Sequence, residues 1–153
     1  MLIVDIAGSV ALTTRVGQEE AGRRIKQLLQ GIVTLVRANG GLFLSSSGDD
    51  VLATFEGEDQ GAANAAETAI EAQRAADAVG LQLYAGLCAG PVEFGENLGY
   101  PTASGQAVNL AARLHKLVDD APGRIFLPMD LVGLLPLDLQ NEASPFGARK
   151  IKG

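Results

Sequence analysis

The sequence predicts an α+β fold with a ferredoxin-like βαββαβ core, a mainly antiparallel sheet flanked by helices. Short apolar runs typical of strands alternate with two long segments that have helical or alanine-rich character. The expected order of these elements is strand, helix, strand, strand, helix, strand. The chain has 153 residues, of which 47% are hydrophobic and 20% charged, which suits one globular domain spanning 1–153.

The first half of the chain supplies this core. Met1–Ile6 is almost wholly apolar and is expected to be a buried central strand, followed by a glycine-containing turn and an irregular lead-in. Apolar residues recur at helical spacing over Gln18–Ala38, and Asn39-Gly40-Gly41 ends this helix. The later expected elements are a hairpin of two strands, an alanine-rich helix and an alternating strand, at Leu42–Ser46, Val51–Phe55, Asp59–Val79 and Leu81–Ala89.

The second half has weaker signals. Val92–Phe94 is expected to extend the sheet, and Gly95–Pro101 to be a loop. The remaining expectations are a third helix, a short strand, a short helix at best and the start of a final strand, at Ser104–Val118, Arg124–Leu127, Pro128–Leu139 and Gly147–Gly153.

Charge and cysteine content exclude several classes of protein. The net charge is −6 and the pI about 4.7, so no basic field favours nucleic acid or an anionic membrane. Cys88 is the single cysteine, so it forms no internal disulfide and is expected to pack in the sheet. No apolar run approaches the roughly 18 residues of a membrane helix, and Met1–Ile6 does not resemble a signal peptide. The cytoplasm is the expected location.

The ferredoxin-like order brings two acidic residues together. The third strand fills the gap beside the first strand, so the end of strand one, with Asp5, lies beside the hairpin that holds Asp49. A carboxylate within an apolar run is costly unless it is paired or binds a cation. The two carboxylates suit Mg²⁺ or Mn²⁺, which prefer oxygen ligands. Alternatively, Asp5 caps the turn after it and Asp49 is an ordinary turn residue.

Two further sets of residues suit phosphate chemistry. The turn Ile6-Ala7-Gly8-Ser9-Val10 offers successive backbone N–H groups to a triphosphate, although it is not a Walker A motif. Asn109 and Arg113 lie four residues apart on one helix face, where they could orient a ribose and stabilise phosphoryl charge. Alternatively, they are an exposed polar pair, and His115 and Lys116 are treated as surface residues. There is no Ser-His-Asp set, zinc-ligand cluster or GxGxxG motif.

Taken in order, six stretches resemble the catalytic domain of class III adenylate/guanylate cyclases. They are LIVDIAGSVAL, GGLFLSSSGDDVLATF, LYAGLCAGPVEFGE, SGQAVNLAARL, PGRIFL and the terminal KIKG, and together they span nearly the whole chain. The most specific are DIAGS, GDDVLATF and VNLAARL.

The resemblance implies a phosphorus–oxygen lyase that forms a 3′,5′-cyclic monophosphate and pyrophosphate from a nucleoside triphosphate. The 3′-hydroxyl would attack the α-phosphorus with the help of two Mg²⁺ or Mn²⁺ ions. Asp5 and Asp49, with the Ile6 carbonyl, would hold the metals, and the turn from Ile6 to Val10 would hold the triphosphate. Asn109 would orient the ribose, Arg113 would stabilise the pentavalent phosphorus, and Lys152 would contact the outer phosphates. Family members are dimers with sites shared between subunits, so Asn109, Arg113 and Lys152 would come from the partner of the chain supplying the carboxylates.

The chain departs from the family pattern at a few positions. Ser45 replaces the base-reading lysine of adenylyl cyclases, and Thr102 stands where Asp is frequent. The pair is not the Glu and Cys expected of guanylyl cyclases, and ATP is the favoured substrate. Val10 replaces a frequent Thr, and the chain stops where a last strand usually follows, as a fragment would. Two other interpretations are a catalytically silent cyclase fold that dimerises or senses nucleotide, and an unrelated ferredoxin-like binding module.

Overall fold

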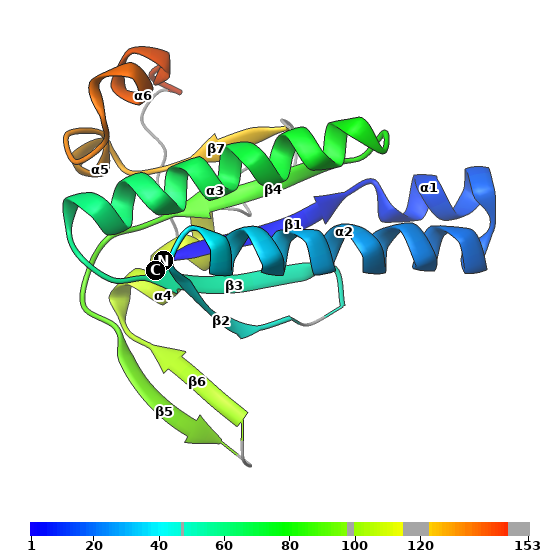
Figure 1. The fold of residues 1–153 in the computed structure, drawn as a ribbon, viewed down its shortest axis with the longest axis horizontal. Helices are drawn as coiled ribbons and strands as arrows, with labels where there is room; N and C mark the ends of the chain where they lie inside the picture. The colour runs from blue at the N-terminus through cyan, green and yellow to red at the C-terminus, as the bar shows by residue number, and fades with distance from the viewer. Residues whose placement is uncertain (47, 98–99, 115–122, 147–153) are drawn as a thin grey trace.

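The central sheet has five strands in the order β2-β3-β1-β4-β7 (Figure 1). The computed structural model describes residues 1–46, 48–97, 100–114 and 123–146. Strand β1 lies between β3 and β4 and is antiparallel to both, whereas β7 is parallel to β4. The first four of these strands have the ferredoxin-like order, which confirms the predicted core. The strand bounds are β1 Leu2–Ala7, β2 Gly41–Ser45, β3 Asp50–Phe55, β4 Gln82–Leu87 and β7 Arg124–Phe126.

Helices cover both faces of this sheet. The long helices α2 (Gln18–Ala38) and α3 (Asp59–Ala78) cover one face, where they pack on Leu2, Val4 and Ile6 of β1. The short helix α4 (Gln106–Leu114) covers the other face, where Ala107 and Ala111 pack with Ile3. The two faces of β1 therefore contribute to two different hydrophobic cores, as expected for alternating side chains of a central strand.

The prediction of an irregular lead-in after the first strand was wrong. Ser9–Val16 forms helix α1, at the blue end of the chain in Figure 1. Leu12 is its one fully buried residue, so the helix carries almost no apolar periodicity for a pattern to reveal. Two threonine hydroxyls on α1 donate hydrogen bonds to backbone carbonyls one turn earlier. By contrast, the bounds of helix α2 match the prediction.

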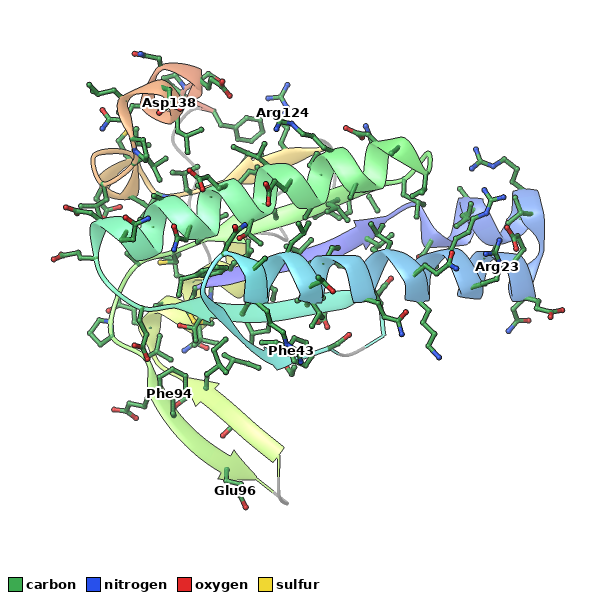
Figure 2. The ribbon with its side chains drawn as sticks, in the orientation of Figure 1. Arg23, Phe43, Phe94, Glu96, Arg124 and Asp138 are labelled. Atoms are coloured by element: carbon green, nitrogen blue, oxygen red, sulfur yellow. The ribbon has the colours of Figure 1, made fainter. Side chains whose placement is uncertain are left out.

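The predictions that Val92–Phe94 extends the sheet and that Gly95–Pro101 is a loop were also wrong. Strands β5 (Glu93–Asn97) and β6 (Tyr100–Ser104) form a separate two-stranded antiparallel hairpin. In Figures 1 and 2 this hairpin projects away from the sheet, with Phe94 and Glu96 on β5. Because it buries little apolar surface, its sequence lacks the alternation that marks a half-buried strand.

The last part of the chain differs from the prediction in detail. Helix α4 begins at Gln106 rather than Ser104, and its predicted continuation over 115–118 lies outside the described residues. Two short helices, α5 (Met129–Val132) and α6 (Leu137–Glu142), take the place of the single short helix expected there. The predicted final strand at 147–153 also lies outside the described residues. Across the described ranges, none of the helices combines the length and apolar character needed to cross a bilayer.

Candidate active site at one edge of the sheet

Three acidic residues come together where β1 ends and β3 begins. Asp5 on β1 lies directly opposite Asp50 on β3, and Asp49 immediately precedes Asp50. The backbone N–H of Ile6 donates a hydrogen bond to the Asp49 carbonyl at 3.1 Å, which fixes the hairpin against the end of β1. All three acidic residues are partly buried. The topology that predicted this meeting of Asp5 and Asp49 is therefore present in the structure.

Asp50 is a residue that the sequence reasoning missed. Residues directly opposite each other in antiparallel strands point to the same face of the sheet. Asp5 and Asp50 therefore share the face that α4 covers, on which Ile3 also lies. Like charges in directly opposite positions are destabilising, and bringing a cation to this edge would relieve their repulsion. The two consecutive aspartates in Gly-Asp-Asp indicated a third carboxylate, but the strand register was needed to show that it lies opposite Asp5.

The turn between β1 and α1 lies at the same edge. Gly8 adopts a φ of 79° at the start of α1, a left-handed conformation that glycine adopts without steric cost. Its carbonyl accepts the first helical hydrogen bond, from the N–H of Leu12 at 2.9 Å. The N–H groups at the beginning of an α-helix have no partner within the helix and carry a partial positive charge. Ser9 and Val10, the first residues of α1, supply such groups beside the carboxylates, and Val10 is 78% exposed.

The side chain of Ser9 adds a contact that the sequence reasoning also missed. Its hydroxyl donates a hydrogen bond to Oδ2 of Asp49, with a distance of 3.4 Å between the two oxygens. The turn thus contacts the β2–β3 hairpin twice, through the Ile6 backbone and through the Ser9 side chain. Behind the turn, Ala7 and Gly8 line a hollow of about 370 Å³ together with Arg15 and Gly80.

The donor chemistry of this edge fits a hard divalent cation. Asp5 and Asp49 offer carboxylate oxygens, and magnesium typically binds one or two carboxylates while keeping room for phosphate oxygens and water. Within the described ranges, no group of three or more histidine, cysteine, aspartate or glutamate side chains is arranged to enclose a metal.

Asn109 and Arg113 do not join the carboxylates within one chain. Both are exposed on α4, whereas Ala107, Ala111 and Leu114 of the same helix are buried against the sheet. Their side chains therefore lie on the helix surface that faces away from the sheet of their own chain. The structure does keep them together on one face, as their spacing predicted.

The remaining predicted residues lie on strands or outside the described residues. Ser45 is exposed at the end of β2, beside an irregularity in the pairing of β2 with β3. Thr102 on β6 lies opposite Gly95 on β5, and a Cβ at position 95 would lie 3.2 Å from the Thr102 hydroxyl oxygen. Lys152 lies outside the described residues.

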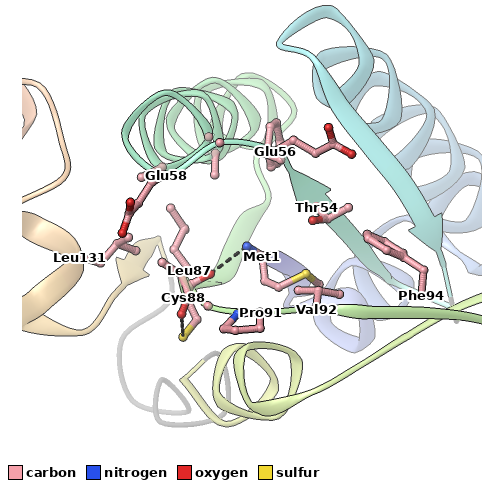
Figure 3. Close-up of a pocket in the computed structure, with 17 residues that line it drawn as sticks. Met1, Thr54, Glu56, Glu58, Leu87, Cys88, Pro91, Val92, Phe94 and Leu131 are labelled. Atoms are coloured by element: carbon pink, nitrogen blue, oxygen red, sulfur yellow. Dashed lines mark hydrogen bonds between the residues drawn. The ribbon is translucent and has the colours of Figure 1, made fainter.

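A second cavity lies away from this edge. It has a volume of about 460 Å³ and lies between the start of α3, the connection from β4 to β5, and α5 (Figure 3). Met1 and Cys88 contribute to its lining, which places it at the opposite end of β1 from Asp5. Its described lining includes none of the predicted site residues that the structure places.

Comparison with known proteins gives matches in structure alone. No family model and no curated protein sequence matches the chain. The adenylyl cyclase CyaB from P. aeruginosa superposes with a TM-score of 0.72 and 21% identity, covering 87% of this chain and 77% of that one. The guanylyl cyclase domain of RhoGC from Blastocladiella emersonii gives 0.74 and 19%, covering 87% and 80%.

A third similar structure contains a nucleotide. It is the guanylate cyclase domain of RhGC from Catenaria anguillulae in complex with GTP, with a TM-score of 0.72 and 20% identity, covering 87% of this chain and 79% of that one. All three share the mixed architecture of a mainly antiparallel sheet flanked by helices. The chain therefore has the fold of class III adenylyl and guanylyl cyclase catalytic domains.

Proposed function

We propose that the chain is a nucleotidyl cyclase that converts a nucleoside triphosphate, with ATP favoured, into its 3′,5′-cyclic monophosphate and pyrophosphate. The observation that carries this proposal is that Asp5 and Asp49 lie at one edge of the sheet, beside the glycine turn that starts α1. Carboxylates that hold cations and N–H groups that hold phosphates are the two features that phosphoryl chemistry requires. The shared fold with adenylyl and guanylyl cyclases supports the same activity.

Each part of this edge has a role in the proposed reaction. Asp5, Asp49 and the Ile6 carbonyl would hold two Mg²⁺ or Mn²⁺ ions. When bound, such ions lower the pKa of the 3′-hydroxyl and neutralise charge on the departing pyrophosphate. The backbone N–H groups from Ile6 to Val10 would bind the triphosphate, with the left-handed Gly8 giving the backbone the close approach it needs.

We propose further that the active form is a homodimer. Asn109 would orient the ribose and Arg113 would stabilise phosphoryl charge, but both face away from the sheet of their own chain. A second copy would bring them to the carboxylate edge, together with Lys152 for the outer phosphates. Apolar surface suited to such a contact is present, because Leu42 on β2 is 55% exposed and Phe94 on β5 is 54% exposed. The cytoplasm, where nucleoside triphosphates are made, is the implied location.

The preference for ATP is expected to be modest. Ser45 is exposed on β2 and carries a hydroxyl where a lysine would give a strong donor to the base. Thr102 on β6 likewise carries a hydroxyl rather than a charged group. Because a site that lacks a base-reading donor discriminates poorly, Ser45→Lys is expected to raise kcat/KM for ATP relative to GTP. An unchanged ratio would remove Ser45 from the base site.

The direct test is the product formed from ATP and from GTP in the presence of Mn²⁺. Asp49→Asn removes a charge that holds the cation, so we expect a loss of more than about 100-fold in kcat. Asp138→Asn is the matched control, since Asp138 is exposed on α6, far from the carboxylate edge in Figure 2. A wild-type protein that dimerises and binds nucleotide without forming any cyclic product would instead support a catalytically silent role.

Shared sites can be tested separately by mixing two inactive variants. Asp49→Asn and Arg113→Ala damage different halves of the proposed site, so a heterodimer of the two keeps one intact site of two. With random exchange, half the dimers are heterodimers, and about one quarter of wild-type activity is expected in the mixture. No recovery, at protein concentrations where the dimer is shown to form and exchange, would contradict sites shared between chains.

A further inference from the structure

We infer that the hydroxyl group of Ser9 positions the Asp49 carboxylate for cation binding, in addition to any role of the Ser9 backbone. This inference rests on the proposed function, because it concerns the same cation site. Its starting observation is the hydrogen bond from Ser9 Oγ to Asp49 Oδ2 at 3.4 Å. Among the residues that the structure describes, Ser9 is the one that donates a side-chain hydrogen bond to Asp49.

The backbone of Asp49 is already held by another contact. The Ile6 N–H donates to the Asp49 carbonyl at 3.1 Å, which fixes where the residue lies but not where its carboxylate points. The side chain can still rotate about two torsions, and ordering it costs entropy. The Ser9 hydroxyl, which belongs to the turn between β1 and α1, reduces this rotational freedom by donating a hydrogen bond to the carboxylate. Outer partners of this kind orient metal-binding side chains and commonly change metal affinity when they are removed.

Charge repulsion makes such a restraint useful before a cation arrives. Asp49 precedes Asp50 in the chain, and Asp50 lies opposite Asp5 across the strand pair. With three carboxylates at one edge, repulsion favours turning the Asp49 side chain outward into water. The Ser9 hydroxyl opposes this rotation by donating to one carboxylate oxygen, which leaves the other oxygen of Asp49 available.

The position of Ser9 in the chain links two parts of the proposed site. Ser9 is the first residue of α1, directly after the left-handed Gly8. Its backbone belongs to the turn that would bind the triphosphate, whereas its side chain contacts the proposed cation ligand. Ser9 therefore belongs to both parts of the proposed site. The contact is longer than the ~2.7–2.8 Å typical of O–H···O hydrogen bonds, so a moderate effect on affinity is expected.

Ser9→Ala deletes the hydroxyl and keeps the backbone N–H, so it isolates the inferred role. We expect the dissociation constant for Mn²⁺ alone, followed by the electron paramagnetic resonance signal of free Mn²⁺, to rise about 3- to 10-fold. This is below the roughly 10- to 100-fold typical of removing an outer partner, because the contact between Ser9 and Asp49 is long. Ser9→Thr keeps the hydroxyl and should bind Mn²⁺ as the wild type does. Thr14→Ala is the matched control, because it removes another α1 hydroxyl, one that donates to the Val10 carbonyl instead.

Kinetics distinguish a positioning role from direct contact with the substrate. In Ser9→Ala the Mn²⁺ concentration for half-maximal rate should rise by the same factor, and kcat should return to within about twofold of the wild type at saturating Mn²⁺. Unchanged Mn²⁺ affinity in Ser9→Ala, with wild-type binding intact, would overturn the inference and leave the proposed function standing. A wild type that neither binds Mn²⁺ nor forms cyclic nucleotide would instead refute the proposed function itself.

Discussion

Gly105 controls how helix α4 begins, and replacing it with alanine should both destabilise the fold and impair the proposed reaction. Its φ is +126°, a conformation that residues with a side chain rarely adopt, and a Cβ there would lie 2.9 Å from the Pro91 carbonyl oxygen. Strained backbone of this kind costs about 1–3 kcal/mol, and the contact with a backbone atom must be relieved by movement. We expect Gly105→Ala to lower the free energy of unfolding by roughly 2–4 kcal/mol.

The functional consequence follows from what Gly105 connects. Its carbonyl accepts the hydrogen bond from the N–H of Asn109 at 3.1 Å, so any shift of Gly105 is transmitted to the first turn of α4. Both denaturant unfolding and cyclic nucleotide formation should therefore be measured. Gly22→Ala is the matched control, because a Cβ at this exposed position in α2 meets nothing within 4 Å, and it should stabilise the fold by roughly 0.5–1 kcal/mol. Equal stability of the Gly105 and Gly22 variants would refute the steric reasoning.

Three other predictions concern the core, a surface carboxylate and the thiol. Ile32→Ala, in the fully buried face of α2, should destabilise the fold by about 2–5 kcal/mol in urea unfolding without changing the m-value. Hydrogen bonds from Arg23 and Arg24 lower the pKa of Glu20 from 4.5 to about 2. The small contribution of ionised Glu20 to the free energy of unfolding is therefore present above pH 4.5 and lost as the pH falls toward 2. Glu20→Gln should flatten the acid side of the stability profile in that window. Burial raises the pKa of the Cys88 thiol, so alkylation at pH 8 should be slow in the native protein and fast in urea.

The parts of the fold that bury much apolar surface could be predicted from the sequence. Helix α2 was located residue by residue because Leu28, Ile32 and Val36 repeat on one buried face. The order of the four core strands followed from short apolar runs and from the ferredoxin-like arrangement. In both cases the hydrophobic pattern reflects the packing that stabilises the element.

The parts that bury little could not be predicted in this way. Helix α1 has Leu12 as its one fully buried residue, and Phe94 on the β5–β6 hairpin is mostly exposed. Neither element leaves a periodic pattern, because no core selects which residues face inward. The position of Asp50 opposite Asp5 could not be predicted either, because it depends on the register of the β1–β3 pair. No local feature of the sequence determines that register.

Several of the predicted site residues are exposed in the same way as these poorly predicted elements. Exposed side chains such as Asn109, Arg113 and Ser45 do not contribute to a core. Packing therefore does not restrict the residue type at these positions, and the residue type can be determined by ligand binding instead. Their placement then depends on the few contacts that hold α4 and the strand ends, among them the close approach of Gly105 to the Pro91 carbonyl, which leaves no room for a Cβ. A small change there would leave both hydrophobic cores largely intact while moving the helix face that carries Asn109 and Arg113. Gly105→Ala should therefore impair cyclic nucleotide formation more than Ile32→Ala does, although both variants lower the free energy of unfolding.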